Sequence, residues 1–238
     1  MPPIHHAKPL TKHLAKQLAN TLLARGGQTV MRAPLYPVDL VFETIPGWFS
    51  ADDALGLWTA ATLANGDFLE IGHYCGRSTS LICQRIQLLG GVNRFVSYDL
   101  SHLSQAELQR HFAALNPTGT TTLPPDLIAL YAAGRTTTDV ARAHLTQHGL
   151  ADYVTLIGGD FREDTSTYDF IFCDAAHHAE EIAANIPHCQ RLLRPTGILA
   201  VHDVTAPLVA AYQQYGFALC VTIGTVGIFR LSAKNKAP

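Results

Sequence analysis

The sequence lacks any apolar run long enough to cross a membrane, because none approaches the roughly 20 consecutive apolar residues that a spanning helix needs. Met1 is not followed by a short apolar core with a small-residue cleavage site, so we expect no secretory signal. Charge is also scarce, since charged residues make up 15% of the chain and the formal net charge is −2. Such a chain offers no strong field to nucleic acid or to an anionic membrane. We therefore expect a cytoplasmic protein without a nucleic-acid or membrane partner.

Cysteine occurs in an odd number and without the spacing of a disulfide or metal framework. No C-x-x-C pair is present, and the cysteines lie within apolar segments. The five are Cys75, Cys83, Cys173, Cys189 and Cys220. We predict buried, reduced thiols, as in a protein of a reducing compartment.

The first 38 residues contain basic side chains and no acid at all. Leucines at helical spacing predict one short amphipathic helix, formed around Leu10, Leu14, Leu18 and Leu22. We interpret residues 1–49 as an extension that caps the active site or forms an oligomer arm, and this makes a homodimer possible. Ser50 is a candidate N-cap for a helix across residues 51–64.

Strand and helix patterns alternate from Asn65 onward. Short apolar runs predict strands at residues 67–71, 94–98, 153–157, 169–173, 197–201, 217–223 and 226–231. Helical spacing predicts helices at about 78–89, 104–115, 178–193 and 205–215. Only Gly224-Thr225 separates the last two strands, which favours a tight hairpin and an antiparallel final strand.

These patterns predict an α/β fold, a doubly wound and mostly parallel seven-stranded sheet with an antiparallel C-terminal hairpin strand. The catalytic domain would span residues 50–238. It would carry an insertion at about 116–150, where prolines, Gly119 and a threonine run precede one helix-like segment.

The first strand ends in a glycine-containing turn, Glu70-Ile-Gly72-His-Tyr-Cys-Gly76-Arg-Ser78-Thr79. The turn has two glycines four residues apart and an acid two residues before the first. A dinucleotide fingerprint has three glycines, which let backbone N–H groups close around a pyrophosphate. A cofactor without phosphate, with a sulfonium and an α-amino group, needs glycine only for close approach and an acid nearby. The turn therefore argues against NAD.

Acidic residues also end the later strands, at the edge where an open parallel sheet binds its ligands. Asp99 ends the second strand, where a carboxylate can accept hydrogen bonds from a ribose diol. Asp160 and Phe161 end the third, where an acid can accept from an adenine amine and a ring can cover its face. The fourth and fifth strands end at Asp174-Ala-Ala-His177-His178 and at His202-Asp203. Each acid alone could be a helix cap or a turn residue, but five in order indicate one site.

Over roughly residues 40–231 the chain resembles the class I S-adenosylmethionine-dependent methyltransferases. The Glu70–Thr79 motif is similar to the first motif of small O-methyltransferases, and its Gly-x-Tyr-Cys-Gly core resembles the catechol type. The Ile45-Pro-Gly-Trp48 stretch resembles a bacterial branch that modifies sugars and natural products. The resemblance implies a Rossmann-like methyltransferase fold and S-adenosyl-L-methionine as the cofactor. It implies that Glu70, Gly72 and Gly76 line the methionine part, Asp99 the ribose, and Asp160 with Phe161 the adenine, with Ser78, Thr79 and Asp174 as further cofactor-binding residues.

The catechol-type comparison also implies a catalytic base and a metal site. It places Asp174 at a metal-ligand position, and His177 where that type has its catalytic lysine, which makes His177 the expected general base. His202-Asp203 falls where that type has an Asp-Asn pair, so Asp174, His202 and Asp203 are candidate ligands for Mg or Mn. His202 departs from the pattern, since magnesium prefers oxygen ligands and an imidazole suits manganese, iron or zinc better. The alternative for His202 is a hydrogen-bonded residue at a strand end.

The function expected is transfer of a methyl group to a hydroxyl of a small acceptor. N-methylation is the nearest alternative. A nicotinamide-dependent oxidoreductase would need the third glycine, which is absent. A non-catalytic cofactor-binding subunit is the alternative that is not an enzyme, and the presence of Asp174, His177 and Asp203 argues against it. We expect no nucleic-acid or membrane partner.

Overall fold

The computed structural model describes residues 41–88, 90–91, 93–115, 123–174 and 179–232. The chain divides into two units, Met1–Val38 and Asp39–Pro238, and the account below concerns the second. The helix expected at residues 10–22 lies outside the described residues, so the N-terminal cap or oligomer arm stays a prediction. The described part begins with a 3₁₀-helix, η1 (Val41–Thr44).

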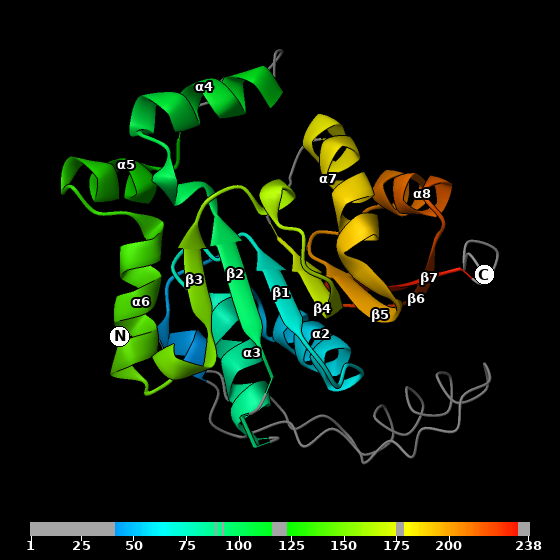
Figure 1. The fold of residues 1–238 in the computed structure, drawn as a ribbon. Helices are drawn as coiled ribbons and strands as arrows, with labels where there is room; N and C mark the ends of the chain where they lie inside the picture. Colours follow the sequence, from blue (N-terminus) through cyan, green and yellow to red (C-terminus); the bar gives the residue numbers. More distant parts are fainter. Residues whose placement is uncertain (1–40, 89, 92, 116–122, 175–178, 233–238) are drawn as a thin grey trace. The chain divides into compact units, whose positions relative to one another are not determined.

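A seven-stranded sheet forms the centre of this unit, in the order β3-β2-β1-β4-β5-β7-β6 (Figure 1). Its strands are β1 (Phe68–Ile71), β2 (Phe95–Asp99), β3 (Thr155–Gly158), β4 (Tyr168–Cys173), β5 (Leu193–Val201), β6 (Phe217–Ile223) and β7 (Val226–Leu231). The first five strands pair in parallel, and β7 runs antiparallel to both β5 and β6. The predicted doubly wound sheet with an antiparallel final strand is confirmed.

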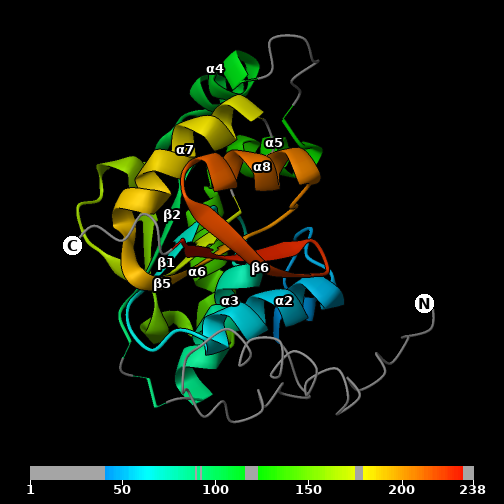
Figure 2. The same cartoon turned by 90° about the vertical axis from the view of Figure 1, so that its right-hand side faces the viewer.

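Helices cover both faces of the sheet. The turned view shows α2 (Ala51–Thr62) and α3 (Arg77–Leu88) on one face, with α7 (Ala179–Leu192) and α8 (Ala206–Gln214) on the other (Figure 2). Between β2 and β3 the chain forms α4 (Gln105–Leu115), α5 (Pro125–Ala132) and α6 (Thr137–Gln147). Short 3₁₀-helices complete the elements: η2 (Leu100–His102), η3 (Ala151–Tyr153) and η4 (Phe161–Glu163). None of the helices in the described ranges is long and apolar enough to cross a membrane.

The start of α2 follows the predicted cap and also fixes the C-terminal hairpin. Ser50 and Asp53 form a capping box, in which each side chain accepts from the other's backbone N–H. Asp53 Oδ1 also accepts from the backbone N–H and hydroxyl of Thr225, at 2.7 and 2.8 Å. Gly224 has φ +59°, and a Cβ there would lie 2.6 Å from Asp53 Oδ1, so this tight β6–β7 turn requires glycine.

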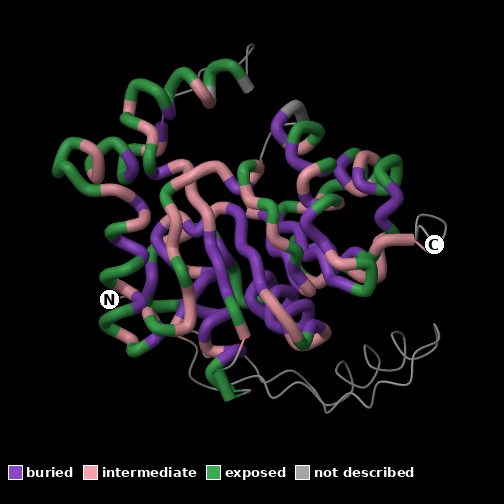
Figure 3. Tube along the Cα trace, in the orientation of Figure 1, coloured by how far each residue is buried: buried purple, intermediate pink, exposed green. Residues whose placement is uncertain are grey.

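The core lies between the central strands and the helices, where the buried residues gather (Figure 3). Leu69 of β1, Ile171 of β4 and Leu199 of β5 are fully buried in one cluster, with Ile186 of α7 packed among them. Both faces of these strands are covered by helices. The strands therefore have apolar residues at consecutive positions and do not alternate between apolar and polar. The predicted burial is confirmed for Cys75, Cys83, Cys173 and Cys189, whereas Cys220 is partly exposed.

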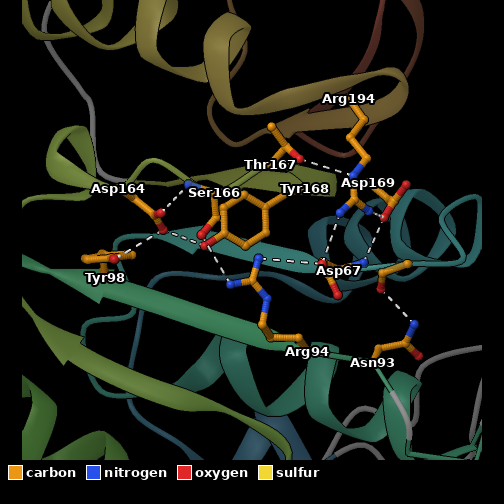
Figure 4. A network of polar contacts seen from close by, with 11 residues as sticks. Asp67, Asn93, Arg94, Tyr98, Asp164, Ser166, Thr167, Tyr168, Asp169 and Arg194 are labelled. Carbon is orange, nitrogen blue, oxygen red and sulfur yellow. Dashed lines mark hydrogen bonds and ion pairs between the residues drawn. The ribbon is translucent and has the colours of Figure 1, made fainter.

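Charged side chains close the amino ends of the central strands, and we call Asp67, Arg94, Asp169 and Arg194 the amino-edge network (Figure 4). Asp169 Oδ2 accepts from the backbone N–H of Asp67 at 2.9 Å. Arg194 pairs with both carboxylates, and Arg94 lies 3.5 Å from Asp67 and over the ring of Tyr168. At this edge each carboxylate has a cation beside it.

Candidate functional site

A cavity of about 490 Å³ opens at the carboxyl ends of the strands. Its walls come from the ends of β1, β2, β4 and β5, from Gly47–Phe49, and from α4, α5 and α7. The chain winds outward in opposite directions from β1 and from β4, which are neighbours in the sheet. The cavity therefore lies at the topological switch point, where doubly wound folds bind ligands, and it has the size of a small-molecule site.

Most of the predicted site residues line this cavity. The lining residues are Gly72, Ser78, Asp99, Asp160, Phe161, Asp174, His202 and Asp203. Three predicted cofactor-binding residues are not in its wall: Glu70, Gly76 and Thr79. His177, the predicted base, and His178 lie outside the described residues.

Glu70 supports the glycine turn from behind the cavity wall. Its side chain is fully buried and accepts hydrogen bonds at 2.6 Å from the hydroxyls of Ser78, Thr79 and Ser97. Burial raises the pKa of Glu70 to about 7, the three hydroxyls oppose that shift, and the charge of Asp174 adds to it. Of the three hydroxyl partners, only Ser78 also faces the cavity.

The glycine turn depends on left-handed backbone at both glycines. Gly72 and Gly76 have φ near +90°, at 91° and 89°. A Cβ on Gly76 would approach the Cβ of Ala141 to 3.2 Å, so this glycine lets α6 pack against the turn. Between the glycines, His73 is buried and bonds to Ser97 and Thr138 at 3.1 and 2.9 Å. Burial lowers the pKa of His73, so this neutral histidine ties the turn to α6, a role that the sequence did not indicate.

Asp99 presents a carboxylate fixed by two hydrogen bonds. The backbone N–H of Tyr74 donates to Oδ2 at 2.9 Å, and the hydroxyl of Thr137 donates to Oδ1 at 2.8 Å. Each oxygen has room for a further bond, because an ionised carboxylate has about four acceptor sites. The Asp99 carboxylate, which we predict to bind the ribose, is thus held in place at the cavity wall and can accept further hydrogen bonds.

Asp160, predicted to contact the adenine, already accepts several hydrogen bonds within the protein. Arg162 donates four hydrogen bonds to it: from the backbone N and from Nε to Oδ1, from Nε to Oδ2, and from the terminal nitrogen to Oδ2, at 2.6–2.9 Å. Burial alone would raise the pKa of Asp160, but the contacts with Arg162 lower it. Phe161 is buried beside it, with its ring centroid 6.2 Å from that of His188. The end of the third strand is therefore closed by an ion pair.

Asp174 and His202 form a second ion pair in the wall, at the ends of β4 and β5. His202 Nδ1 lies 2.7 Å from Asp174 Oδ1, and its Nε2 lies 3.6 Å from Asp53. Burial by itself lowers the pKa of His202, but the hydrogen bond and charge of Asp174, together with Asp203 and Asp53, raise it to about 9. The imidazole is therefore a cation at neutral pH and balances the charge of Asp174.

This arrangement does not fit the predicted divalent metal ion. His202 Nδ1, one of the two ring nitrogens that could bind a metal, already bonds to the expected carboxylate ligand Asp174. Asp203 has a left-handed backbone, with φ +54°, and a half-exposed side chain. Over the ranges that the structure describes, no three His, Cys, Asp or Glu residues are grouped to hold an ion. The structure gives the predicted metal site no support, and the contacts of His202 favour the alternative of a hydrogen-bonded residue at a strand end.

Aromatic side chains also line the cavity, among them Trp48 and Tyr74. Trp48 is 68% exposed yet stacks on Tyr74, with ring centroids 5.2 Å apart. The Tyr74 hydroxyl bonds to Asp126 of α5. Trp48 belongs to a motif that the sequence singled out, but the contact with α5 joins distant segments and had no sequence signal.

Solved structures share this fold. A SAM-dependent O-methyltransferase from Thermotoga maritima matches with a TM-score of 0.54 and 14% identity over 92% of this chain and 83% of that one. A ribosomal protein L11 methylase from Lactobacillus delbrueckii subsp. bulgaricus matches with 0.52 and 14%, over 79% and 81%. An O-methyltransferase from Bacillus cereus, in complex with SAH, matches with 0.50 and 16%, over 82% and 90%. At these identities the likeness shows the fold.

The sequence itself identifies the family. No curated protein matches the chain. The family described as "Methyltransferase domain" matches residues 69–204, more than half of the chain and the span from β1 to the end of β5. That span contains the glycine turn and the acids at the strand ends. The chain therefore belongs to this methyltransferase family and is an S-adenosylmethionine-dependent methyltransferase.

Proposed function

We propose that this enzyme methylates a hydroxyl oxygen of a small acceptor, held above the ends of β4 and β5. The observation that carries the proposal is the Asp174–His202 ion pair, which lines the cavity two strands from Asp99. If Asp99 holds the ribose, the methyl end of the cofactor extends toward this pair. A fixed, charge-balanced carboxylate there can orient an acceptor hydroxyl without acting as an uncompensated buried charge.

The chemistry is an in-line displacement, in which the acceptor oxygen bonds to the methyl carbon as the carbon–sulfur bond breaks. The cavity wall contributes apolar and aromatic groups, among them Phe49, Trp48 and Leu127. These groups favour a dry site in which acceptor and methyl group are held in line. The acceptor proton leaves to a base, for which we keep His177, three residues after Asp174. A neutral imidazole can take that proton near neutral pH.

The choice of oxygen and of a small acceptor rests on two arguments. Two of the structures described above are named O-methyltransferases, which supports oxygen. A third is named a ribosomal protein methylase, so the fold alone leaves the acceptor open. A small acceptor is supported by a cavity of about 490 Å³, which suits a cofactor with a small partner better than a folded protein.

The proposal assigns no step to the predicted Mg or Mn ion, because Asp174 pairs with His202 and no three candidate ligands are grouped among the described residues. It keeps the cytoplasmic location, which the four buried cysteine thiols support. It also keeps the expectations of no nucleic-acid partner, no membrane partner and a possible homodimer.

The test is turnover of methyl-labelled S-adenosylmethionine against a panel of phenols, sugars and amines, with each product analysed by mass spectrometry. We expect label on oxygen for at least one hydroxylated acceptor. Label on nitrogen alone would replace O-methylation by N-methylation. Cofactor binding without turnover of any acceptor would favour a non-catalytic subunit, and reduction of NAD would contradict the proposal altogether.

A further inference from the structure

A buried carboxyl on α7 has no role in the proposed reaction. Glu181 is 8% exposed and lines the cavity. Its Oε2 has no hydrogen-bond partner among the residues that the structure describes. Burial raises the pKa of Glu181 to about 7, and the charge of Arg162 opposes that shift. An unsatisfied buried carboxyl oxygen costs free energy, and such groups occur where a ligand supplies the missing partner.

The position of Glu181 points to one end of the cavity. Ala184 and Asn185, one turn further along α7, line the same wall. His188, two turns from Glu181 on the same helix face, contacts the ring of Phe161. The charge of Arg162, the residue after Phe161, acts on the Glu181 carboxyl, so Glu181 lies on the side of the cavity near the end of the third strand.

The neighbouring acid is less suited to receive a new hydrogen bond there. Asp160 accepts four hydrogen bonds from Arg162. A carboxylate has about four acceptor sites, so the capacity of Asp160 is nearly filled. Glu181 keeps a free oxygen on the same side of the cavity. A donor that reaches this end meets Glu181 as the available acceptor.

We propose that Glu181 recognises the exocyclic amine of the cofactor's adenine by accepting its N–H through Oε2. The inference rests on the proposed function, because it assumes S-adenosylmethionine in this cavity. It moves the amine contact from Asp160 to Glu181 and leaves Asp160 to hold Arg162 in place. Glu181 is then a specificity-determining residue that distinguishes adenine from purines without a 6-amino group.

The test is a calorimetric comparison of two probes, S-adenosylhomocysteine and its analogue with hydrogen in place of the 6-amino group. Wild type should prefer the first by about 10- to 100-fold, the range for one hydrogen bond to a charged group. Glu181→Met removes the acceptor and should bind both probes within about threefold of each other. Asp160→Asn should keep most of the preference. Glu181→Gln keeps an acceptor oxygen and should give an intermediate value.

Thermal unfolding of the ligand-free proteins separates recognition from a structural role. Removal of an unsatisfied buried carboxyl should raise the Tm of Glu181→Met while its cofactor affinity falls. A merely structural Glu181 would lower both.

Two results would overturn the inference. One is a full wild-type preference in Glu181→Met, and its loss in Asp160→Asn at the same time would return the amine contact to Asp160. If Glu181→Met does not fold, an unchanged preference in Glu181→Gln is decisive. Failure of wild type to bind S-adenosylhomocysteine would instead reject the proposed function, and with it this inference.

Discussion

The two edges of the sheet use charged residues in opposite ways. At the amino edge, Asp67 and Asp169 are paired with Arg94 and Arg194, and no ligand is needed to complete the network. At the carboxyl edge, acids line a cavity and keep unused acceptor capacity, as Glu181 Oε2 and the oxygens of Asp99 illustrate. The amino edge is complete by itself, whereas the carboxyl edge requires a bound molecule.

The comparison assigns stability to the charged residues at the amino ends of the strands and ligand binding to those at the carboxyl ends. Partly exposed ion pairs stabilise a fold by small amounts, so the amino edge should affect unfolding more than activity. Groups that await a ligand contribute little to the stability of the free protein and much to binding. Substitutions at the two edges should therefore differ in which measurement they change.

The largest effect is expected from His177. His177→Ala should lower kcat by roughly 10²–10⁴-fold with little change in cofactor affinity, because a general base acts in the transition state. His178→Ala is the matched control and should do little. The readouts are kcat and the acidic limb of the pH–rate profile, which should disappear in the His177 variant. Equal small losses in both variants would show that the base is elsewhere.

Asp99→Ala should have the next largest effect, on binding. The loss of its hydrogen bonds to the ribose should weaken S-adenosylhomocysteine binding by about 10- to 100-fold. The same substitution also releases Thr137 and the Tyr74 N–H, so Thr137→Val serves as a control for that loss. Calorimetric titration measures both variants. Similar affinity losses in the two would assign Asp99 a supporting role only.

His202 gives stability a pH dependence at the carboxyl edge. Its pKa is raised from the ordinary 6.5 to about 9 in the folded protein. The stabilisation is therefore complete below pH about 6.5, declines as pH rises, and is lost above about 9. Relative to His202→Gln, wild type should lose roughly 1–3 kcal/mol of unfolding free energy between pH about 6 and about 9.5. Urea unfolding checks this, and a difference independent of pH would contradict the ion pair.

Asp169→Ala should have a smaller effect and a different kind of effect. It removes the acceptor of the Asp67 N–H and the partner of Arg194. We expect a loss of about 1–2 kcal/mol in the free energy of unfolding, because the network is partly exposed. Turnover and cofactor affinity should stay at the wild-type values. A drop in kcat without a change in stability would break the comparison between the two edges.

Chelation should have no effect. Because Asp174 pairs with His202, we expect full methyl transfer in excess EDTA. Loss of activity with EDTA that is restored by magnesium or manganese would return Asp174 and Asp203 to the metal site first predicted for them.

The fold class and the position of the site could be predicted from the sequence, because they follow from the alternation of strands and helices and from the direction of the chain. The predicted strands at 217–223 and 226–231 coincide with β6 and β7, since Gly224 marks the turn between two apolar runs. The predicted start of β5, at residue 197, is wrong, because the strand begins at Leu193. The strand follows α7 without a loop, and its segment Pro195-Thr196-Gly197 has the composition of a turn.

The hydrogen-bond and ion-pair partners of the site residues could not be predicted from the sequence, because they come from distant segments. His202 lies between Asp174 and Asp53, which belong to β4's end and to α2. Glu181 carried no signal, because helical periodicity cannot distinguish a face that lines a cavity from one that packs on the core. A sequence shows which acids reach the carboxyl edge, whereas packing decides which oxygens remain available.

The most direct test of this account is titration of S-adenosylhomocysteine into three proteins: wild type, Asp99→Ala and Asp169→Ala. The account predicts a single site in wild type, clearly weaker binding in Asp99→Ala, and wild-type affinity in Asp169→Ala despite its lower unfolding free energy. Undetectable binding to wild type at millimolar ligand would contradict the assignment of the cavity. Equal losses in the two variants would contradict the division of roles between the edges of the sheet.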